Sequence, residues 1–215
     1  MHLRQPFPER GLYAITNGPR PDLVAACEAA LRGGAAVLQY RDKTSDAAQR
    51  HAQALALARI CADHRVPLIV NDDIDLAVAV GAAGVHLGAD DTDVASARAR
   101  LGATAVIGVS CYDSLERARE LALAGADYLA FGAFFSSSTK PLARRAIPGV
   151  LSAAKRLGKP LVAIGGITPD NARLLLDAGA DFVAAISGVF SGADPESAAR
   201  GYANLFQNLK RIHVH

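Results

Sequence analysis

The chain has 215 residues, 51% hydrophobic and 20% charged, so it is long and apolar enough for one well-buried domain and is not a disordered chain. Its net charge of +2 is too small to indicate a nucleic acid or a membrane surface as partner, although a local basic cluster still suits a small anion. The three cysteines, Cys27, Cys61 and Cys111, include no CxxC pair, which argues against a disulfide framework or a zinc site and fits a reducing cytoplasm.

The first ten residues carry charges and two prolines but lack the apolar stretch of a secretory signal. No apolar stretch reaches 18 residues without a charge or a break, so we expect no membrane-spanning helix. We expect a single domain over residues 1–215, with an N-terminal extension at 1–10 and a C-terminal tail at 204–215.

Short apolar runs then alternate with longer stretches that have a helical period. Most of the runs are continuously apolar, which is typical of parallel strands covered on both faces. The expected strands, in chain order, are Leu12–Thr16, Ala36–Arg41, Pro67–Asp72, Gly84–Gly88, Ala105–Ser110, Tyr128–Ala133, Leu161–Gly166 and Phe182–Ser187.

Helix start and stop signals lie between these runs. The expected helices are Asp22–Arg32, Ser45–Asp63 with Thr44 or Ser45 as the N-cap, Asp93–Leu101, Ser114–Ala124, and a segment that starts at Thr168-Pro169 and stops at Gly179. Ala/Gly turns also recur before every second strand, at residues 33–35, 82–84, 124–127 and 178–181. The pattern predicts an α/β fold, a single (β/α)₈ TIM barrel, because the competing doubly wound sheet usually has five or six strands.

In such a barrel the chemistry lies at the C-terminal ends of the strands. Arg41, Lys43 and Lys140 follow the second and sixth runs, and cations of this kind suit phosphate oxygens. Gln39, Arg41 and Lys43 alternate, so an extended segment would turn them to one face. The spacing alone leaves two interpretations open, a polyanion site and a solvated charged loop.

Carboxylates follow the third and fourth runs. Asp72 and Asp91 fit the sparse ligand set of Mg²⁺, which takes one or two carboxylates together with phosphate oxygens and water. Asp73, Asp90 and Asp93 are better suited to helix starts.

Two Gly/Ser turns, Gly165-Gly166 and Ser187-Gly188, follow the seventh and eighth runs. Their position predicts the phosphate site common in barrels, built from backbone N–H groups. The Ser136–Lys140 run is either a flexible surface loop or a loop that binds phosphate. We expect Arg144 and Arg145 to be solvated, and His86 to be a core histidine rather than a general base.

These motifs, taken in order, resemble those of the thiamine-phosphate synthase family. The matching segments run from about Leu12 to Pro195 and are Gln39-Tyr40-Arg41-Asp42-Lys43, Asn71-Asp72, His86-Leu87-Gly88 with Asp91, Gly108-Val109-Ser110, Thr139-Lys140, Gly165-Gly166-Ile167 and Ile186-Ser187. The resemblance implies a transferase that joins hydroxymethylpyrimidine diphosphate to hydroxyethylthiazole phosphate, with Mg²⁺ on the diphosphate. The products are thiamine phosphate and pyrophosphate.

The resemblance also implies a role for each matching residue. Asp72 and Asp91 hold Mg²⁺, Ser110 lies near the pyrimidine and the leaving group, and Arg41, Lys140 and Ser110 form the catalytic set. The diphosphate binds Gln39, Arg41, Lys43, Asn71, Ser137, Thr139 and Lys140. The thiazole phosphate binds Gly166, Ile186 and Ser187.

The chain departs from the family pattern at Ala89, at Ala133 and at Ser136-Ser137-Ser138, which stand where the family often has Gln, Pro and a Pro-Thr-x segment. Two other classes remain open at this stage. One is a thiazole tautomerase-like isomerase, which tends to lack the cations and carboxylates. The other is a non-catalytic phosphate-binding or regulatory barrel. The sequence leaves open whether the chain forms a homo-oligomer, the kinetic order, and the roles of His86 and Cys111.

Overall fold

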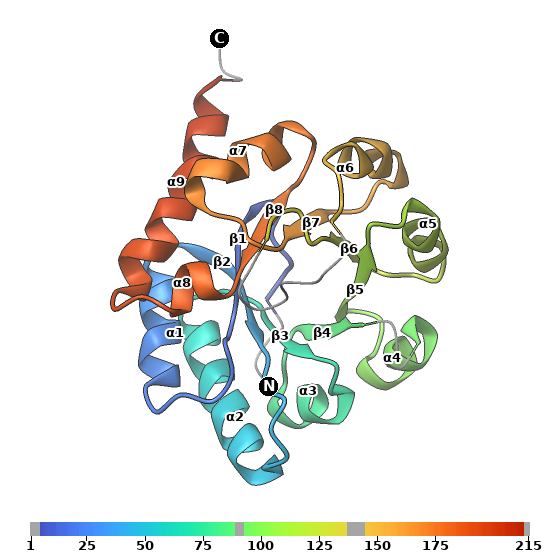
Figure 1. The fold of residues 1–215 in the computed structure, drawn as a ribbon. Coiled ribbons are helices and arrows are strands. Elements are labelled where there is room, and N and C mark those ends of the chain that lie inside the picture. Colours follow the sequence, from blue (N-terminus) through green and yellow to red (C-terminus); the bar gives the residue numbers. More distant parts are fainter. Residues whose placement is uncertain (1–4, 89–92, 137–144, 213–215) are drawn as a thin grey trace.

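The structure is a computed structural model that describes residues 5–88, 93–136 and 145–212. In these segments eight parallel strands close into a barrel in chain order, with helices on the outside (Figure 1). The strands are β1 (Gly11–Ile15), β2 (Ala35–Tyr40), β3 (Leu68–Asn71), β4 (Gly84–Leu87), β5 (Val106–Tyr112), β6 (Tyr128–Phe131), β7 (Leu161–Ile164) and β8 (Phe182–Ala185). The predicted TIM barrel is confirmed, because β8 pairs with β1 and closes the sheet.

The helices of the described segments are α1 (Leu23–Arg32), α2 (Ala47–Asp63), α3 (Ile74–Val80), α4 (Val94–Leu101), α5 (Leu115–Leu123), α6 (Gly149–Ala154) with a 3₁₀ turn at Lys155–Leu157, α7 (Pro169–Asp177), α8 (Ser187–Phe190) and α9 (Pro195–Ile212). The five helices predicted by range are confirmed within a few residues as α1, α2, α4, α5 and α7, whereas no range was predicted for α3, α6, α8 or α9.

Two boundaries differ from the sequence analysis. The N-cap of α2 is Asp46, not Thr44 or Ser45, because its carboxylate accepts the backbone N–H of Gln49 at 2.9 Å. The predicted tail from residue 204 is helical as far as Ile212, because α9 continues through these residues (Figure 1).

The barrel wall separates two hydrophobic clusters. The outer cluster fills the space between the strands and the helices. The inner cluster fills the barrel and contains Tyr13, Ile15, Val37, Ile69, Ala83, Val106, Tyr128, Ala130, Val162, Phe182 and Ala184. Since successive strand residues point to opposite faces, continuously apolar strands supply both clusters.

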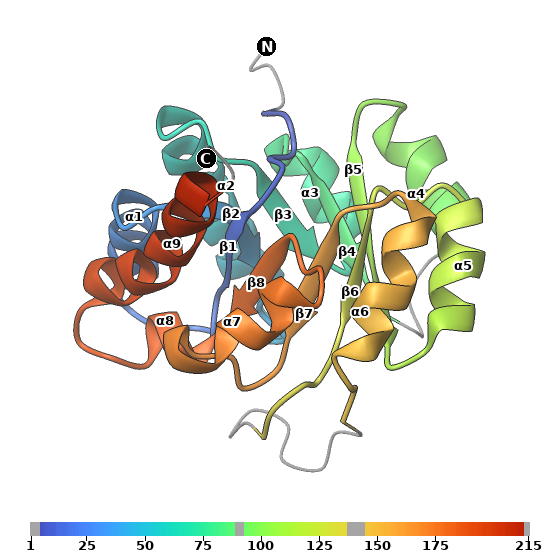
Figure 2. The same cartoon turned by 90° about the horizontal axis from the view of Figure 1, so that it is seen from above.

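The predicted N-terminal extension closes one end of the barrel. Phe7 stacks on the Tyr128 ring with centroids 4.8 Å apart and also contacts Phe182. Figure 2 shows the N-terminal segment at this end and the segment that follows β6 at the opposite end. The floor is therefore sealed by aromatic rings, and ligands have access from the opposite end.

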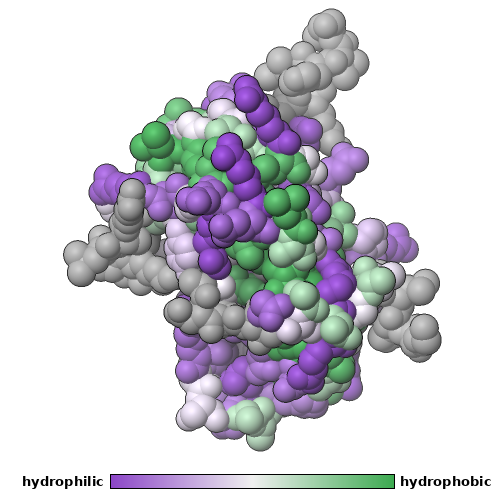
Figure 3. Space-filling model, turned by 90° about the vertical axis from the view of Figure 1, so that its right-hand side faces the viewer, coloured by the Kyte–Doolittle hydropathy of each residue, from purple (hydrophilic) through white to green (hydrophobic). Residues whose placement is uncertain are grey.

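The outer surface carries scattered apolar residues. Seen from the side of α4, α5 and α6, hydrophobic and hydrophilic residues are mixed (Figure 3). Large exposed hydrophobic residues include Leu123 and Ile147. No helix within the described residues is long and apolar enough to cross a membrane.

Candidate active site

A cavity of about 450 Å³ opens at the C-terminal ends of the strands. That volume suits a small-molecule ligand. All eight strands or the loops that follow them contribute to its wall, and the predicted site residues among its lining are Gln39, Arg41, Asn71, Ser110, Gly166, Ile186 and Ser187. The structure thus brings together residues from five separate predicted motifs.

Two hydrogen bonds fix the backbone of Arg41 at the cavity. The buried hydroxyl of Thr16, just after β1, donates to the Arg41 carbonyl at 3.0 Å and accepts the Arg41 N–H at 2.8 Å. Both backbone groups of Arg41 are therefore fixed by one side chain, in a residue that lines the cavity.

Lys43 and Asp72 meet beside the cavity. Lys43 Nζ lies 3.6 Å from Asp72 Oδ2, and Asn71 Nδ2 donates to the same oxygen at 2.5 Å. Asp72 has a φ of 64° and donates its N–H to the His86 carbonyl at 2.9 Å. This left-handed turn separates the Asp72 side chain from that of Asp73.

Asp73 has a different function. Its carboxylate accepts the N–H of Leu76 at 2.9 Å as the N-cap of α3, and Arg50 donates to it at 2.6 Å. The sequence assignment of Asp73 to a helix start is confirmed, as is that of Asp93, which caps α4. No group of three or more His, Cys, Asp or Glu residues within the described part of the chain is arranged to hold a metal.

A row of hydrogen bonds crosses the inside of the barrel beneath the cavity. Gln39 Nε2 donates to the Tyr13 hydroxyl at 2.9 Å, and the Tyr13 and Tyr128 hydroxyls lie 2.7 Å apart. His86 Nδ1 is 2.9 Å from the Tyr128 hydroxyl, and His86 Nε2 is 2.9 Å from Ser110 Oγ. We call this series the floor chain: Gln39, Tyr13, Tyr128, His86 and Ser110.

The tyrosines of the floor chain are deeply buried. Tyr13 and Tyr128 are at most 1% exposed, and burial raises the pKa of both hydroxyls well above the usual range. Both therefore remain protonated and able to donate. Gly108 leaves space for the Tyr128 ring, because a Cβ at this position would collide with that ring.

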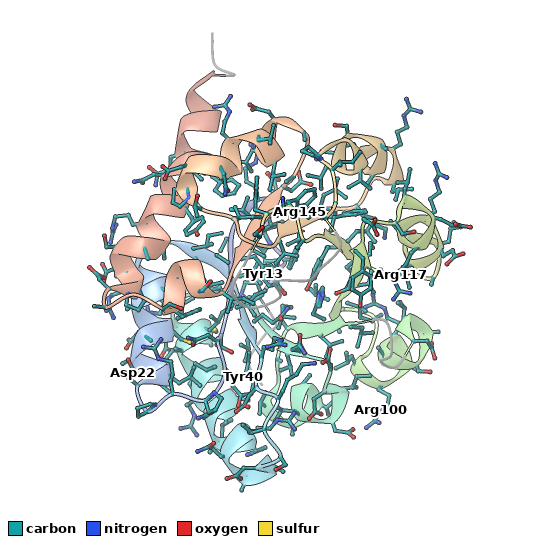
Figure 4. The ribbon with its side chains drawn as sticks, in the orientation of Figure 1. Tyr13, Asp22, Tyr40, Arg100, Arg117 and Arg145 are labelled. Carbon is teal, nitrogen blue, oxygen red and sulfur yellow. The ribbon has the colours of Figure 1, made fainter. Side chains whose placement is uncertain are left out.

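Arg117 of α5 holds the end of β5. Its Nε donates to the Ser110 carbonyl at 2.9 Å and its Nη2 to the Gly88 carbonyl at 3.3 Å. The guanidinium also lies 5.9 Å from the ring of Tyr112 at the cavity wall, on the α5 side of the barrel in Figure 4. One side chain thus ties together the ends of β4 and β5.

The ends of β7 and β8 form the far side of the cavity. Gly165 and Gly166 have φ values of 104° and 62°, and a Cβ on Gly166 would collide with the Ser136 carbonyl. Asn171 of α7 donates to the Gly166 carbonyl at 3.1 Å. Close packing against the segment after β6 is thus a second reason for glycine here, besides the predicted approach of a phosphate.

Several predicted site residues lie outside the described residues. They are Asp91, Ser137, Thr139 and Lys140, together with the departure at Ala89. Next to them, Arg145 is exposed, as expected, and donates to the Ser136 hydroxyl. Their roles stay predictions.

Sequence reasoning missed Thr16, Tyr13, Tyr128 and Arg117. Each tyrosine occurs within an apolar run and reads as an ordinary core residue. The only local sign of their role is a polar group within a continuously buried strand, and this sign does not identify the hydrogen-bond partner of that group. Cys111 is buried, and burial raises the pKa of its thiol to about 12, so it is a core residue rather than a nucleophile.

The fold and the cavity define a class. This is a (β/α)₈-barrel enzyme whose strand ends place cations and a carboxylate on one side of an apolar pocket and Gly/Ser turns on the other. Such a site suits two small phosphorylated ligands.

Comparison with known proteins shows which family of barrel enzymes the chain resembles. The family model described as thiamine monophosphate synthase matches residues 12–189. The chain is 56% identical over 194 residues to a thiamine-phosphate synthase of Xanthomonas campestris pv. campestris, covering 90% of this chain and 94% of that protein. It is 52% identical over 208 residues to the thiamine-phosphate synthase of Halorhodospira halophila, covering 96% and 99%.

A solved structure agrees with these sequences. The thiamine phosphate pyrophosphorylase of Pyrococcus furiosus superposes with a TM-score of 0.84 at 32% identity, over 94% of this chain and 97% of that one. The chain belongs to the thiamine monophosphate synthase family. It is a transferase of thiamine phosphate synthesis, and the predicted family is confirmed.

Proposed function

We propose that the enzyme forms thiamine phosphate by a Mg²⁺-dependent dissociative substitution. The bond between the pyrimidine methylene carbon and the diphosphate oxygen breaks first, and its electron pair leaves with the diphosphate. The thiazole nitrogen then donates its lone pair to the methylene cation, and the C–N bond forms. The arrangement of charged groups on one side of the cavity carries this proposal.

The cationic side of the cavity suits the leaving diphosphate. Arg41 lines the cavity, and Lys43 lies beside it next to Asp72. Negative charge grows on the diphosphate as the C–O bond breaks, so fixed cations stabilise the transition state more than the ground state. Lys140 is proposed as a further cation of this set. No acid–base residue is needed to release a group stabilised in this way.

The donor set beside these cations fits Mg²⁺. The Asp72 side chain is 32% exposed, and its carboxylate offers a hard oxygen ligand next to the proposed diphosphate site. Mg²⁺ is commonly held by one or two carboxylates plus substrate phosphates, so Asp72 and Asp91 would suffice as protein ligands. When bound, the ion would neutralise charge on the diphosphate.

The middle of the cavity suits a short-lived cation. Apolar side chains line it, among them Ile15, Ala130, Val162, Ile164 and Ala184. A lining of this kind leaves few sites for water, which would otherwise capture the methylene cation and give the alcohol. The lining thus favours transfer over hydrolysis.

The experiment that tests the proposal is a coupled assay for pyrophosphate with both substrates. Pyrophosphate and thiamine phosphate are expected in equal amounts with Mg²⁺, and neither is expected in excess chelator. A tautomerase-like isomerase would release no pyrophosphate, and full turnover in chelator would contradict the metal requirement.

The thiazole phosphate is proposed to bind at Gly166, Ile186 and Ser187. Ser187 begins α8 and lines the cavity, so Ser187→Ala removes a hydroxyl from the phosphate side. We expect KM for the thiazole phosphate to rise roughly tenfold, as for a hydrogen bond to a charged group, with KM for the pyrimidine diphosphate unchanged.

Ser191→Ala is the matched control for this variant. Ser191 is exposed one turn further along, at the end of α8, and both KM values should stay at wild type. Equal increases in both KM values of Ser187→Ala would show that the two anion sites are assigned wrongly. Gly166 is a poorer probe, since any side chain there also disturbs the segment after β6.

A further inference from the structure

The floor chain links five polar side chains by hydrogen bonds inside a barrel that is otherwise filled with apolar residues. One end is the Gln39 amide and the other is the Ser110 hydroxyl. Gln39 is 3% exposed, and both residues line the cavity. Buried polar groups are costly unless they are satisfied, so a row of this length calls for a function at the cavity.

The row has a direction, and Gln39 sets it. Because the Gln39 amide nitrogen donates to the Tyr13 hydroxyl, that oxygen acts as an acceptor, and the Tyr13 proton points to Tyr128. Tyr128 then donates to His86 Nδ1. The reverse order would need an acceptor, not an amide nitrogen, beside Tyr13.

This direction fixes the state of the histidine. With Nδ1 accepting from Tyr128, the proton of the neutral ring is on Nε2, which faces Ser110 Oγ at 2.9 Å. Ser110 Oγ therefore accepts from His86, and its own proton is left to be donated elsewhere. Toward the cavity, the group that needs a donor is an anionic oxygen of the diphosphate.

We propose that the floor chain is a positioning device that keeps the Ser110 hydroxyl oriented as a donor toward the leaving diphosphate, with His86 and Tyr128 as positioning residues. This rests on the proposed role of Ser110. The packing supports it: Phe7 stacks on Tyr128 from below, and Gly108 leaves the space in which that ring sits. Both contacts hold the Tyr128 hydroxyl at its place in the row.

The test is a double-mutant cycle with Tyr128→Phe and Ser110→Ala, measured as kcat in the full-length enzyme with Mg²⁺ and both substrates. Tyr128→Phe keeps the ring and removes one hydrogen bond, so kcat should fall roughly three- to tenfold, with KM for the thiazole phosphate unchanged. In the Ser110→Ala background, Tyr128→Phe should have no further effect on kcat.

Tyr40→Phe is the matched control. Tyr40 is also buried, but its hydroxyl donates to Gln53 of α2 at 2.9 Å, on the outer side of β2, whereas Tyr13 lies within the barrel (Figure 4). This variant loses a buried hydroxyl outside the floor chain, and its kcat should stay at wild type. A fall in kcat equal to that of Tyr128→Phe would overturn the proposal, since the loss of any buried hydroxyl would then have the same effect.

The outcomes separate the two proposals. Wild-type kcat in Ser110→Ala would remove Ser110 from the proposed mechanism, and the positioning device with it. A low kcat in Ser110→Ala, with an undiminished effect of Tyr128→Phe in that background, would overturn only the device. In the wild-type protein, ¹⁵N NMR should show the Nε2–H tautomer of His86, and the Nδ1–H tautomer would contradict the direction even if a variant failed to fold.

Discussion

Asp72→Asn is expected to lower kcat/KM by on the order of 10²-fold or more, while Asp73→Asn should leave turnover near wild type. The substitution weakens the proposed Mg²⁺ site, and losing the ion's charge next to a developing anion typically costs about 3–4 kcal/mol. Asp72 is the carboxylate next to the proposed diphosphate site, whereas Asp73 is occupied as the cap of α3 and by Arg50. The two residues are neighbours in the chain with different tasks.

Asparagine is a suitable replacement at both positions. Asp72 has a φ of 64°, and asparagine tolerates this left-handed conformation better than most residues, so the backbone should stay in place. At position 73 asparagine is also a good N-cap, and only the ion pair with Arg50 is lost.

The measurement is steady-state turnover over a Mg²⁺ titration, with thermal unfolding of each variant as a check on the fold. Asp72→Asn should need more Mg²⁺ for half-maximal rate, and Asp73→Asn should show a change in Tm without a change in the Mg²⁺ curve. Equal kinetic effects of the two substitutions would rule out Asp72 as the specific metal ligand.

Arg41→Ala is the second change with a large expected effect. We expect kcat/KM to fall by on the order of 10²-fold or more, with kcat clearly reduced, because the guanidinium would stabilise charge that grows on the diphosphate. Thr16 holds both backbone groups of Arg41, so the substitution removes the guanidinium and leaves the loop in place. Lys140→Ala is expected to behave in the same way.

Arg173→Ala provides the control for a lost arginine. Arg173 is exposed on α7 and paired only with Asp177 among the contacts described for its side chain, so kcat/KM should not change. For Arg41→Ala, kcat and KM are measured separately by varying the pyrimidine diphosphate at saturating thiazole phosphate. A change confined to KM would mean that Arg41 binds ground state and transition state equally, which would be inconsistent with the proposed mechanism.

Several elements of the fold follow from local sequence. Short apolar runs, most of them continuous, marked all eight strands, and the Asp93 cap and the Thr168-Pro169 start placed α4 and α7, since these signals depend on neighbouring residues only. The same reasoning placed Gln39, Arg41 and Ser110 at strand ends, where the cavity opens. Their roles in the family came from the resemblance.

Local signals were weaker at two boundaries. Thr44, Ser45 and Asp46 are all suitable N-caps by residue type, and only the geometry showed that Asp46 accepts the Gln49 N–H at the start of α2. The helix α9 packs beside α1, which is distant in the chain, so the residues of the predicted tail do not reveal that contact.

The sequence by itself therefore determined the barrel, the order of its strands and the end at which the cavity opens. Only the tertiary structure decided which buried groups meet: Tyr13 with Tyr128, 115 residues apart, and Thr16 with Arg41, 25 residues apart. Periodicity says which face of a strand is buried, but the pairing of side chains across a closed barrel depends on the stagger of all the strands around it. No local pattern in the chain carries that information.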